Sequence, residues 1–203
     1  MTSNDETPQL VLASASPARL RTLRAAGLDA TVIVSGVDED AVTADGPADL
    51  AATLARLKAE AVAVRLGAPG LVLGCDSVLG LDGRILGKPT GAADATRRWR
   101  SMRGRSGVLY TGHCLIDTGS GKRAAGLGAT TVHFADVTDD EIAAYVASGE
   151  PLHVAGAFTI DGLGGPFVER IEGDPGTVIG LSLPLLRRLL AELGIRLTDL
   201  WIG

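Results

Sequence analysis

Short apolar runs alternate with amphipathic segments in the first part of the chain, and this alternation constrains the fold most strongly. Residues 9–13 form an apolar run of strand length. A helix signal follows, with Ser16 as the N-cap, Pro17 at the first helical position and Gly27 as the stop. Residues 31–34 predict a second strand. Strands that alternate with helices favour an α/β fold.

Residues 47–66 predict a long amphipathic helix, which Gly67 closes. Its apolar residues recur at intervals of three and four, and they are Leu50, Leu54, Leu57 and Ala61. We expect this stripe to face the core, with Lys58 one position past it. Residues 71–74 predict the next strand, and Asp76 follows just beyond its end.

The second half of the chain is rich in hairpin signals. An Asp-Gly turn at 81–84 separates two apolar runs, and residues 118–122 separate two longer strand-like segments. Further helices are predicted at 90–102, after the capping box 138–141, and at 184–193. No internal repeat or low-complexity linker interrupts the sequence. We therefore predict one domain over residues 1–203, with a disordered N-terminus at 1–8. Its expected fold is a mixed, twisted sheet flanked by helices, in two lobes with a cleft between them.

Composition excludes several classes of protein. Of the 203 residues, 46% are hydrophobic and 21% are charged, which excludes intrinsic disorder, and no apolar run approaches the ~20 residues of a membrane span. The net charge of −5 disfavours binding to nucleic acid or to an anionic membrane. The N-terminus shows no secretory signal, so we expect a cytoplasmic protein. We interpret Cys75 and Cys114, which lack CxxC spacing, as buried small hydrophobes.

Two segments carry residues that suit anion binding. Ser14 and Ser16 lead into a helix N-terminus with Arg19 one turn further on, which is an arrangement that binds anions. A capped helix with a surface arginine explains the same pattern. Lys88 lies between a glycine and a proline, and it is one of only three lysines in the chain, with Lys58 and Lys122.

Carboxylates form the other candidate group. Asp76 follows an apolar strand, where ligands of open α/β sheets gather, although aspartate also starts ordinary turns. The acidic cluster 38–40 is either a solvated loop or, if it lies near Asp76, part of an oxygen-rich site suited to Mg²⁺ or Mn²⁺.

Taken together and in order, these blocks resemble one family. They read Ser14-Ala15-Ser16-Pro17-Ala18-Arg19, Asp38-Glu39, Lys58-Ala59, Gly74-Cys75-Asp76-Ser77 and Gly87-Lys88-Pro89. They are similar to the S-x-S-P-R-R, D-E, K-A, G-A-D-T and G-K-P motifs of Maf-type nucleoside triphosphate pyrophosphatases. The resemblance covers residues 10–194 and includes later blocks such as Tyr110-Thr111-Gly112 and Gly149-Glu150-Pro151.

The resemblance implies an ITPase/Maf-like fold and a hydrolase that converts nucleoside triphosphates to monophosphate and pyrophosphate with a divalent cation, Mg²⁺ or Mn²⁺. It also makes a homodimer the expectation, as for many enzymes of this size. By this resemblance, the expected catalytic residues of this sequence are Asp76, as the general base, and Glu39, Lys58 and Lys88. Glu39 and Asp76 are the expected metal ligands. The expected substrate-binding residues are Ser14, Ser16, Arg19, Ser77 and Asp161.

The chain departs from the family pattern at positions that bear on substrate preference. Ala18, Ser77 and Asp161 occupy positions at which the resembled branches differ. Val154 replaces a usual lysine, and Ala18 reduces a usual double arginine to Arg19 alone. Loss of two cations predicts weaker phosphate or base contacts, so the preferred base stays open.

A second class of function is a non-catalytic nucleotide or nucleic-acid binder with a regulatory role, since the family name has been linked with septum formation. The basic stretch 97–105 favours it, whereas the net charge and the 3% aromatic content oppose it. A helix with a solvated basic face and Trp99 against the core also explains that stretch, and we favour this interpretation. A dinucleotide-dependent oxidoreductase is excluded because no GxGxxG follows the first strand.

Overall fold

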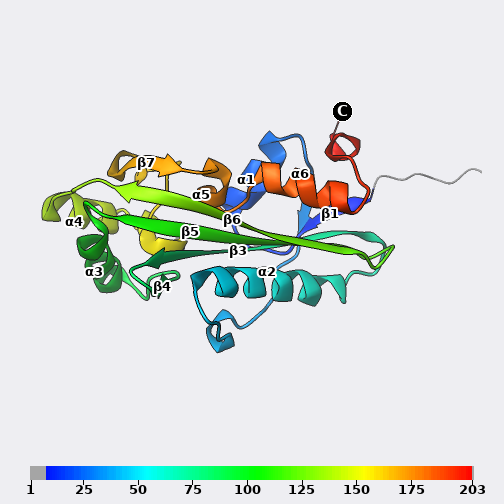
Figure 1. Cartoon of the computed structure of the whole chain (residues 1–203), viewed down its shortest axis with the longest axis horizontal. Helices are drawn as coiled ribbons and strands as arrows, with labels where there is room; N and C mark the ends of the chain where they lie inside the picture. Colours follow the sequence, from blue (N-terminus) through cyan, green and yellow to red (C-terminus); the bar gives the residue numbers. More distant parts are fainter. Residues whose placement is uncertain (1–7, 203) are drawn as a thin grey trace, which may run out of the picture.

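The structure is a computed structural model that describes residues 8–202. Apart from Pro8, the predicted disordered N-terminus lies outside the described residues. The chain forms a seven-stranded sheet with helices on both faces (Figure 1). The strands are β1 Gln9–Leu12, β2 Ala30–Val32, β3 Gly70–Leu81, β4 Arg84–Leu86, β5 Ser106–Asp117, β6 Arg123–Phe134 and β7 Val168–Glu172. The α-helices are α1 Pro17–Ala25, α2 Pro47–Ala63, α3 Ala92–Met102, α4 Asp139–Ala147, α5 Pro175–Ile179 and α6 Leu183–Glu192. The 3-10 helices are η1 Glu39–Ala41, η2 Glu150–His153, η3 Ala155–Ala157, η4 Gly165–Phe167 and η5 Leu197–Leu200.

The sheet is mixed, as predicted. Its order is β2-β1-β3-β5-β6-β7, with β4 beside β3. Strand β1 pairs in parallel with β2 and β3, and the other pairs are antiparallel. The hairpins expected at 81–84 and 118–122 join β3 to β4 and β5 to β6. Among residues 8–202, no helix combines the length and the apolar character that crossing a membrane requires.

Strands β3, β5 and β6 have twelve residues each, and their two ends contribute to two different apolar cores. A third, smaller core lies between the sheet and α2. The first core lies between the sheet and helices α1 and α6, and it includes Leu73 of β3. The second core lies at the α3 and α4 end of the sheet, and it includes Leu79 of the same strand. Between the two, β3 carries the polar residues Asp76 and Ser77. Two lobes thus share their central strands, with polar side chains at the boundary.

Helix α2 covers the face of the sheet opposite α1 and α6, and it packs very close to the strands (Figure 1). A Cβ atom on Gly74 of β3 would lie 2.2 Å from the carbonyl oxygen of Ala55. A Cβ atom on Gly112 of β5 would lie equally close, at 2.2 Å, to the carbonyl oxygen of Ala51. Glycine at both positions is therefore what allows the helix backbone to approach the sheet.

This close approach corrects the predicted apolar stripe. Leu50, Leu57 and Ala61 are only half-buried. The buried face of α2 consists mainly of small residues, and its members are Ala51, Leu54, Ala55, Lys58, Ala59 and Val62. The prediction is confirmed for Leu54 but was wrong for Leu50, Leu57 and Ala61. Large side chains usually mark the core, whereas here the close approach at the two glycines favours alanines on the buried face. Lys58 lies on the buried face rather than past it.

Strand β3 is also longer than predicted, since it continues past residue 74 to Leu81. Asp76 therefore lies within a strand and not in a loop after it. On the edge toward β1, residues 70–73 pair with β1 and residues 79–81 pair with β4. In the described part of the chain, residues 74–78 have no strand partner on that edge. The sheet thus has a gap beside Asp76, where β1 ends and its loop begins.

Candidate functional site

A cleft of about 1290 Å³ opens at this gap. Its lining comes from the loops after β1 and β2, from α2 and the middle of β3, from the turn 87–90 and from the segment 150–162. All nine predicted site residues line it: Ser14, Ser16, Arg19, Glu39, Lys58, Asp76, Ser77, Lys88 and Asp161. Segments that are distant in sequence therefore meet at one site.

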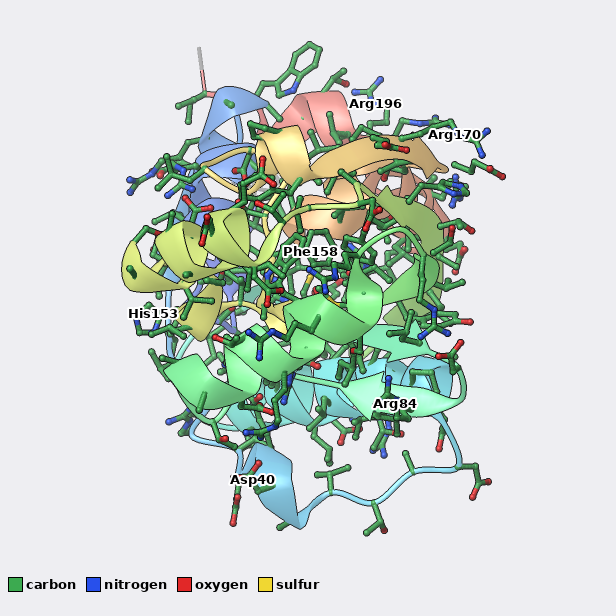
Figure 2. All side chains as sticks on the ribbon, turned by 90° about the vertical axis from the view of Figure 1, so that its left-hand side faces the viewer. Asp40, Arg84, His153, Phe158, Arg170 and Arg196 are labelled. Carbon is green, nitrogen blue, oxygen red and sulfur yellow. The ribbon has the colours of Figure 1, made fainter. Side chains whose placement is uncertain are left out.

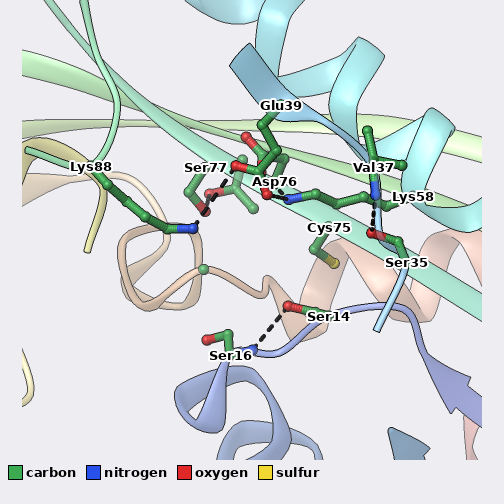
Figure 3. A network of polar contacts seen from close by, with 12 residues as sticks. Ser14, Ser16, Ser35, Val37, Glu39, Lys58, Cys75, Asp76, Ser77 and Lys88 are labelled. Carbon is green, nitrogen blue, oxygen red and sulfur yellow. Dashed lines mark hydrogen bonds and ion pairs between the residues drawn. The ribbon is translucent and has the colours of Figure 1, made fainter. Parts of the chain in front are cut away.

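Lys58 lies between two carboxylates in this cleft (Figure 3). Its Nζ is 2.6 Å from Asp76 Oδ1 and 2.6 Å from Glu39 Oε1. The side chains of Lys58 and Asp76 are only 7% and 9% exposed, whereas that of Glu39 is 38% exposed. Within residues 8–202 no hydrogen bond reaches Asp76 Oδ2, which leaves that oxygen free to accept a proton.

The two carboxylates differ in pKa because their surroundings differ. Burial raises the pKa of Asp76 above its ordinary value, although Lys58 and Arg19 act in the opposite direction. Burial also acts to raise the pKa of Glu39, but the hydrogen bond and the charge of Lys58 outweigh it, so that pKa is lowered. Such a separation is typical of a pair in which one carboxylate exchanges protons and the other stays ionised.

Lys88 and the acidic loop complete this side of the cleft. Lys88 Nζ is 3.9 Å from Glu39 Oε2, and its side chain is largely exposed, so the ammonium is accessible from the cleft. Of the acidic cluster 38–40, only Glu39 forms an ion pair with a site residue, through its position on η1. Figure 2 shows Asp40 pointing outward from the edge of the molecule.

Arg19 anchors the serine loop after β1 through hydrogen bonds to Ser14 and Ser16. Ser16 caps α1 by accepting a hydrogen bond from the Arg19 backbone, as predicted. The Arg19 guanidinium is buried and donates to Ser14 Oγ at 2.9 Å, to the Cys75 carbonyl at 2.9 Å and to the Gly180 carbonyl at 2.8 Å. Arg19 therefore joins the loop, β3 and the end of α5, and much of its hydrogen-bonding capacity is used within the protein.

Ser77 extends this network on the far face of β3. It accepts from Arg19 Nη2 at 3.0 Å and lies 2.9 Å from Thr111 Oγ1. Thr111 in turn donates to the Thr177 carbonyl at 2.7 Å, so Ser77 is the donor to Thr111. The roles of Thr111 and Thr177 were not predicted. The signal that was available is the block Tyr110-Thr111-Gly112.

Asp161 lies at the rim of the cleft. Its carboxylate is 3.9 Å from Arg21 on α1, and both side chains are exposed. Nearby Glu150 accepts four hydrogen bonds, a role that the sequence did not indicate beyond its place in the block Gly149-Glu150-Pro151. Cys75 and Cys114 are buried and unpaired, as interpreted from the sequence, and burial raises the pKa of Cys75 to about 12.

Comparison with known proteins gives a consistent result. Residues 9–193 match the family described as Maf-like protein. A relative from Salinispora tropica named nucleoside triphosphate pyrophosphatase is 66% identical, over 95% of this chain and 87% of that protein. Relatives with the same name from Streptomyces coelicolor and a Synechococcus species are 63% and 57% identical, each over 96% of this chain and over 97% and 98% of the relative.

A solved structure from Mycobacterium abscessus, titled nucleoside-triphosphatase / dITP/XTP pyrophosphatase, aligns with 64% of this chain and 75% of that one. Its sequence identity is 17% and the TM-score is 0.41. The family match is independent of this likeness and spans nearly the whole chain. From this match and the three close relatives, we conclude that the chain belongs to the Maf-like protein family.

Proposed function

We propose that this chain hydrolyses nucleoside triphosphates to the monophosphate and pyrophosphate. The observation that carries the proposal is the buried Lys58 bridging Glu39 and Asp76 at 2.6 Å each, with Lys88 nearby, in a cleft of about 1290 Å³. Cleavage of the α–β anhydride needs a base for the attacking water and cations for the phosphoryl oxygens. The names of the relatives support this reaction.

In the proposed step, Asp76 takes a proton from the attacking water. The water oxygen forms a new bond to phosphorus, the bridging P–O bond breaks, and the electron pair leaves with pyrophosphate. The raised pKa of Asp76 suits this role, because a general base works best when its pKa approaches the working pH. Lys58 orients Asp76 through Oδ1, and Lys88 offers an exposed ammonium to the phosphates.

We also propose Glu39 and Asp76 as ligands of a divalent cation, Mg²⁺ or Mn²⁺. Among residues 8–202 no group of three or more His, Cys, Asp or Glu side chains forms a complete metal site. The two carboxylates nevertheless converge on one cation, the Lys58 ammonium. Mg²⁺ is commonly bound by one or two carboxylates together with substrate phosphates, so the donor set fits. The cation would offset charge on the phosphoryl oxygens.

The test is pyrophosphate release from a panel of canonical and modified nucleoside triphosphates, with Mg²⁺, with Mn²⁺ and with a chelator. We expect Asp76→Asn to lower the rate by ~10² to 10⁴, because the base is lost. The matched control is Asp140→Asn, since Asp140 is exposed on α4 and does not line the cleft. Near-normal release by Asp76→Asn, with a native circular dichroism spectrum, would refute the assignment.

The competing function, binding of nucleic acid without turnover, has less support. Trp99 of α3 is fully buried, and the arginines around it are already paired with acids. The pairs are Arg97–Asp94, Arg100–Asp139, Arg103–Asp139 and Arg105–Asp82. Arg98 also pairs with Asp94, so five arginines share three carboxylates and the charge of the basic stretch is partly offset. A salt-sensitive gel shift of DNA that Asp76→Asn leaves unchanged would favour this second function.

A further inference from the structure

The segment 159–164 forms one wall of the cleft, and Glu150 organises it. Glu150 Oε1 accepts hydrogen bonds from Thr159 Oγ1 at 2.6 Å and from the Gly164 backbone at 3.0 Å. Glu150 Oε2 accepts from the Leu163 backbone at 2.9 Å. One carboxylate thus binds both ends of a short segment that carries Asp161 at the cleft rim.

Tyr145 of α4 fixes Glu150 in turn. Its hydroxyl donates to Glu150 Oε1 at 3.0 Å and accepts from the Thr159 backbone at 3.2 Å. The Tyr145 ring is buried in the second core, where it packs edge-on against Trp99. The hydrogen bonds of the segment therefore connect it to the second core.

At two positions, Gly162 and Gly164, the backbone of the segment passes too close to these two side chains for a Cβ atom. A Cβ on Gly162 would lie 2.5 Å from Glu150 Oε2, and one on Gly164 would lie 2.4 Å from the Tyr145 hydroxyl. This explains the glycine-rich sequence. A glycine-rich segment has many conformations, so it needs bonds of this kind to keep one of them.

The Glu150 carboxylate is ionised at neutral pH. Burial acts to raise its pKa, but the hydrogen bonds from Thr159, Leu163 and Gly164 outweigh burial, and the pKa is lowered. Hydrogen bonds to an ionised acceptor are stronger than those to a neutral one. The glutamate anion, rather than any acceptor of the same shape, therefore orders the wall.

We propose that Glu150 is a positioning residue that holds segment 159–164 in the conformation that binds the nucleoside part of the substrate. This inference rests on the proposed function. Lys58 and Lys88, which suit the phosphates, lie with Glu39 in one part of the cleft. The wall with Asp161 carries no cation of its own and offers backbone and carboxylate groups instead, which suit a sugar and a base. Through this segment, Glu150 influences the affinity for the nucleotide and the preference for its base. It does not take part in the chemical step.

The experiment compares Glu150→Gln with wild type in two measurements. Hydrogen exchange without nucleotide should show faster exchange at Leu163 and Gly164. Steady-state kinetics over a panel of triphosphates should show KM values raised about tenfold, a changed ranking of the bases and a smaller change in kcat. Tyr145→Phe keeps the buried ring and should show the same effects more weakly. Glu169→Gln, an exposed change on β7, is the matched control.

Unchanged exchange at Leu163 and Gly164 would overturn the inference, and so would faster exchange with wild-type KM values and base ranking. A fall in kcat with unchanged KM would also overturn it, because it would place Glu150 in the chemical step. These failures are distinct from failure of the proposed function, in which wild-type protein itself would release no pyrophosphate.

Discussion

At the scale of single residues, the most consequential side chain is Lys58. It is a buried cation that contacts two carboxylates, and only one of them, Asp76, is buried with it. A buried ion pair gains little over an apolar pair, but removal of one partner leaves an uncompensated charge. The charge of Lys58 therefore matters for stability as well as for binding.

We expect Lys58→Met to lower the free energy of unfolding by about 3 kcal/mol, because Asp76 is left buried and unpaired. The double variant Lys58→Met/Asp76→Asn should regain most of this loss, since it removes both charges. Urea denaturation of the four proteins of this cycle gives the coupling energy. A coupling below about 0.5 kcal/mol, the level found for exposed pairs, would contradict this account.

At the scale of elements, the packing of α2 on the glycines of β3 and β5 determines where Lys58 lies. In Gly74→Ala, the added methyl would meet the Ala55 oxygen at 2.2 Å and the Ala59 nitrogen at 2.7 Å, both of them backbone atoms of α2. Backbone cannot rotate away as a side chain can, so the helix has to move.

Gly74→Ala should therefore cost about 1–3 kcal/mol of stability and lower kcat/KM by ~10², because Lys58 moves away from Asp76. Denaturation and steady-state kinetics measure the two effects. Gly67→Ala serves as the control, since a Cβ at Gly67 meets nothing within 4 Å. If Gly74→Ala were as active as the Gly67→Ala control, the close packing of α2 on β3 would not be what positions Lys58 beside Asp76.

Much of the element pattern is predictable from local signals. The capping box of Thr138 and Glu141 opens α4, and Ser16 caps α1, because both depend on residues within one turn. The end of β3 and the buried face of α2 could not be predicted in this way. Glycine is typical of a strand end, and only the packing of α2 against β3 shows that Gly74 lies within the strand. Similarly, the site residues could be predicted from the family motifs. The internal hydrogen bonds of Arg19 could not, because one of them goes to the carbonyl of Gly180, which is 161 residues away in the sequence.

At the scale of the whole molecule, His113 joins the sheet to α6. Its Nδ1 donates to the Thr111 carbonyl at 3.1 Å, and its Nε2 accepts from the Ser182 backbone at 2.9 Å, at the N-cap of α6. This pattern requires the neutral ring. Burial lowers the pKa of His113 to about 4, from an ordinary value of 6.5.

The sign of the pH effect follows from these values. Between pH 6.5 and pH 4 the unfolded chain binds a proton at this position and the folded chain does not, so stability falls as the pH falls. The full effect is about 3 kcal/mol. Denaturation at several pH values should show a flatter profile for His113→Gln, whereas exposed His153→Gln should keep the wild-type slope. Equal slopes for all three proteins would refute this role.

The homodimer stays a prediction from family analogy and size, and light scattering over a range of protein concentrations would test it.

The three twelve-residue strands that run through both lobes also limit how the cleft can change shape. Rotation of one lobe against the other would have to bend three adjacent, hydrogen-bonded strands at the same level. Rigid-body closure is thus costly here. We therefore expect any change in the shape of the cleft to occur at its perimeter, in the loops after β1 and β2 and in the turn at Lys88, which line it outside the shared strands.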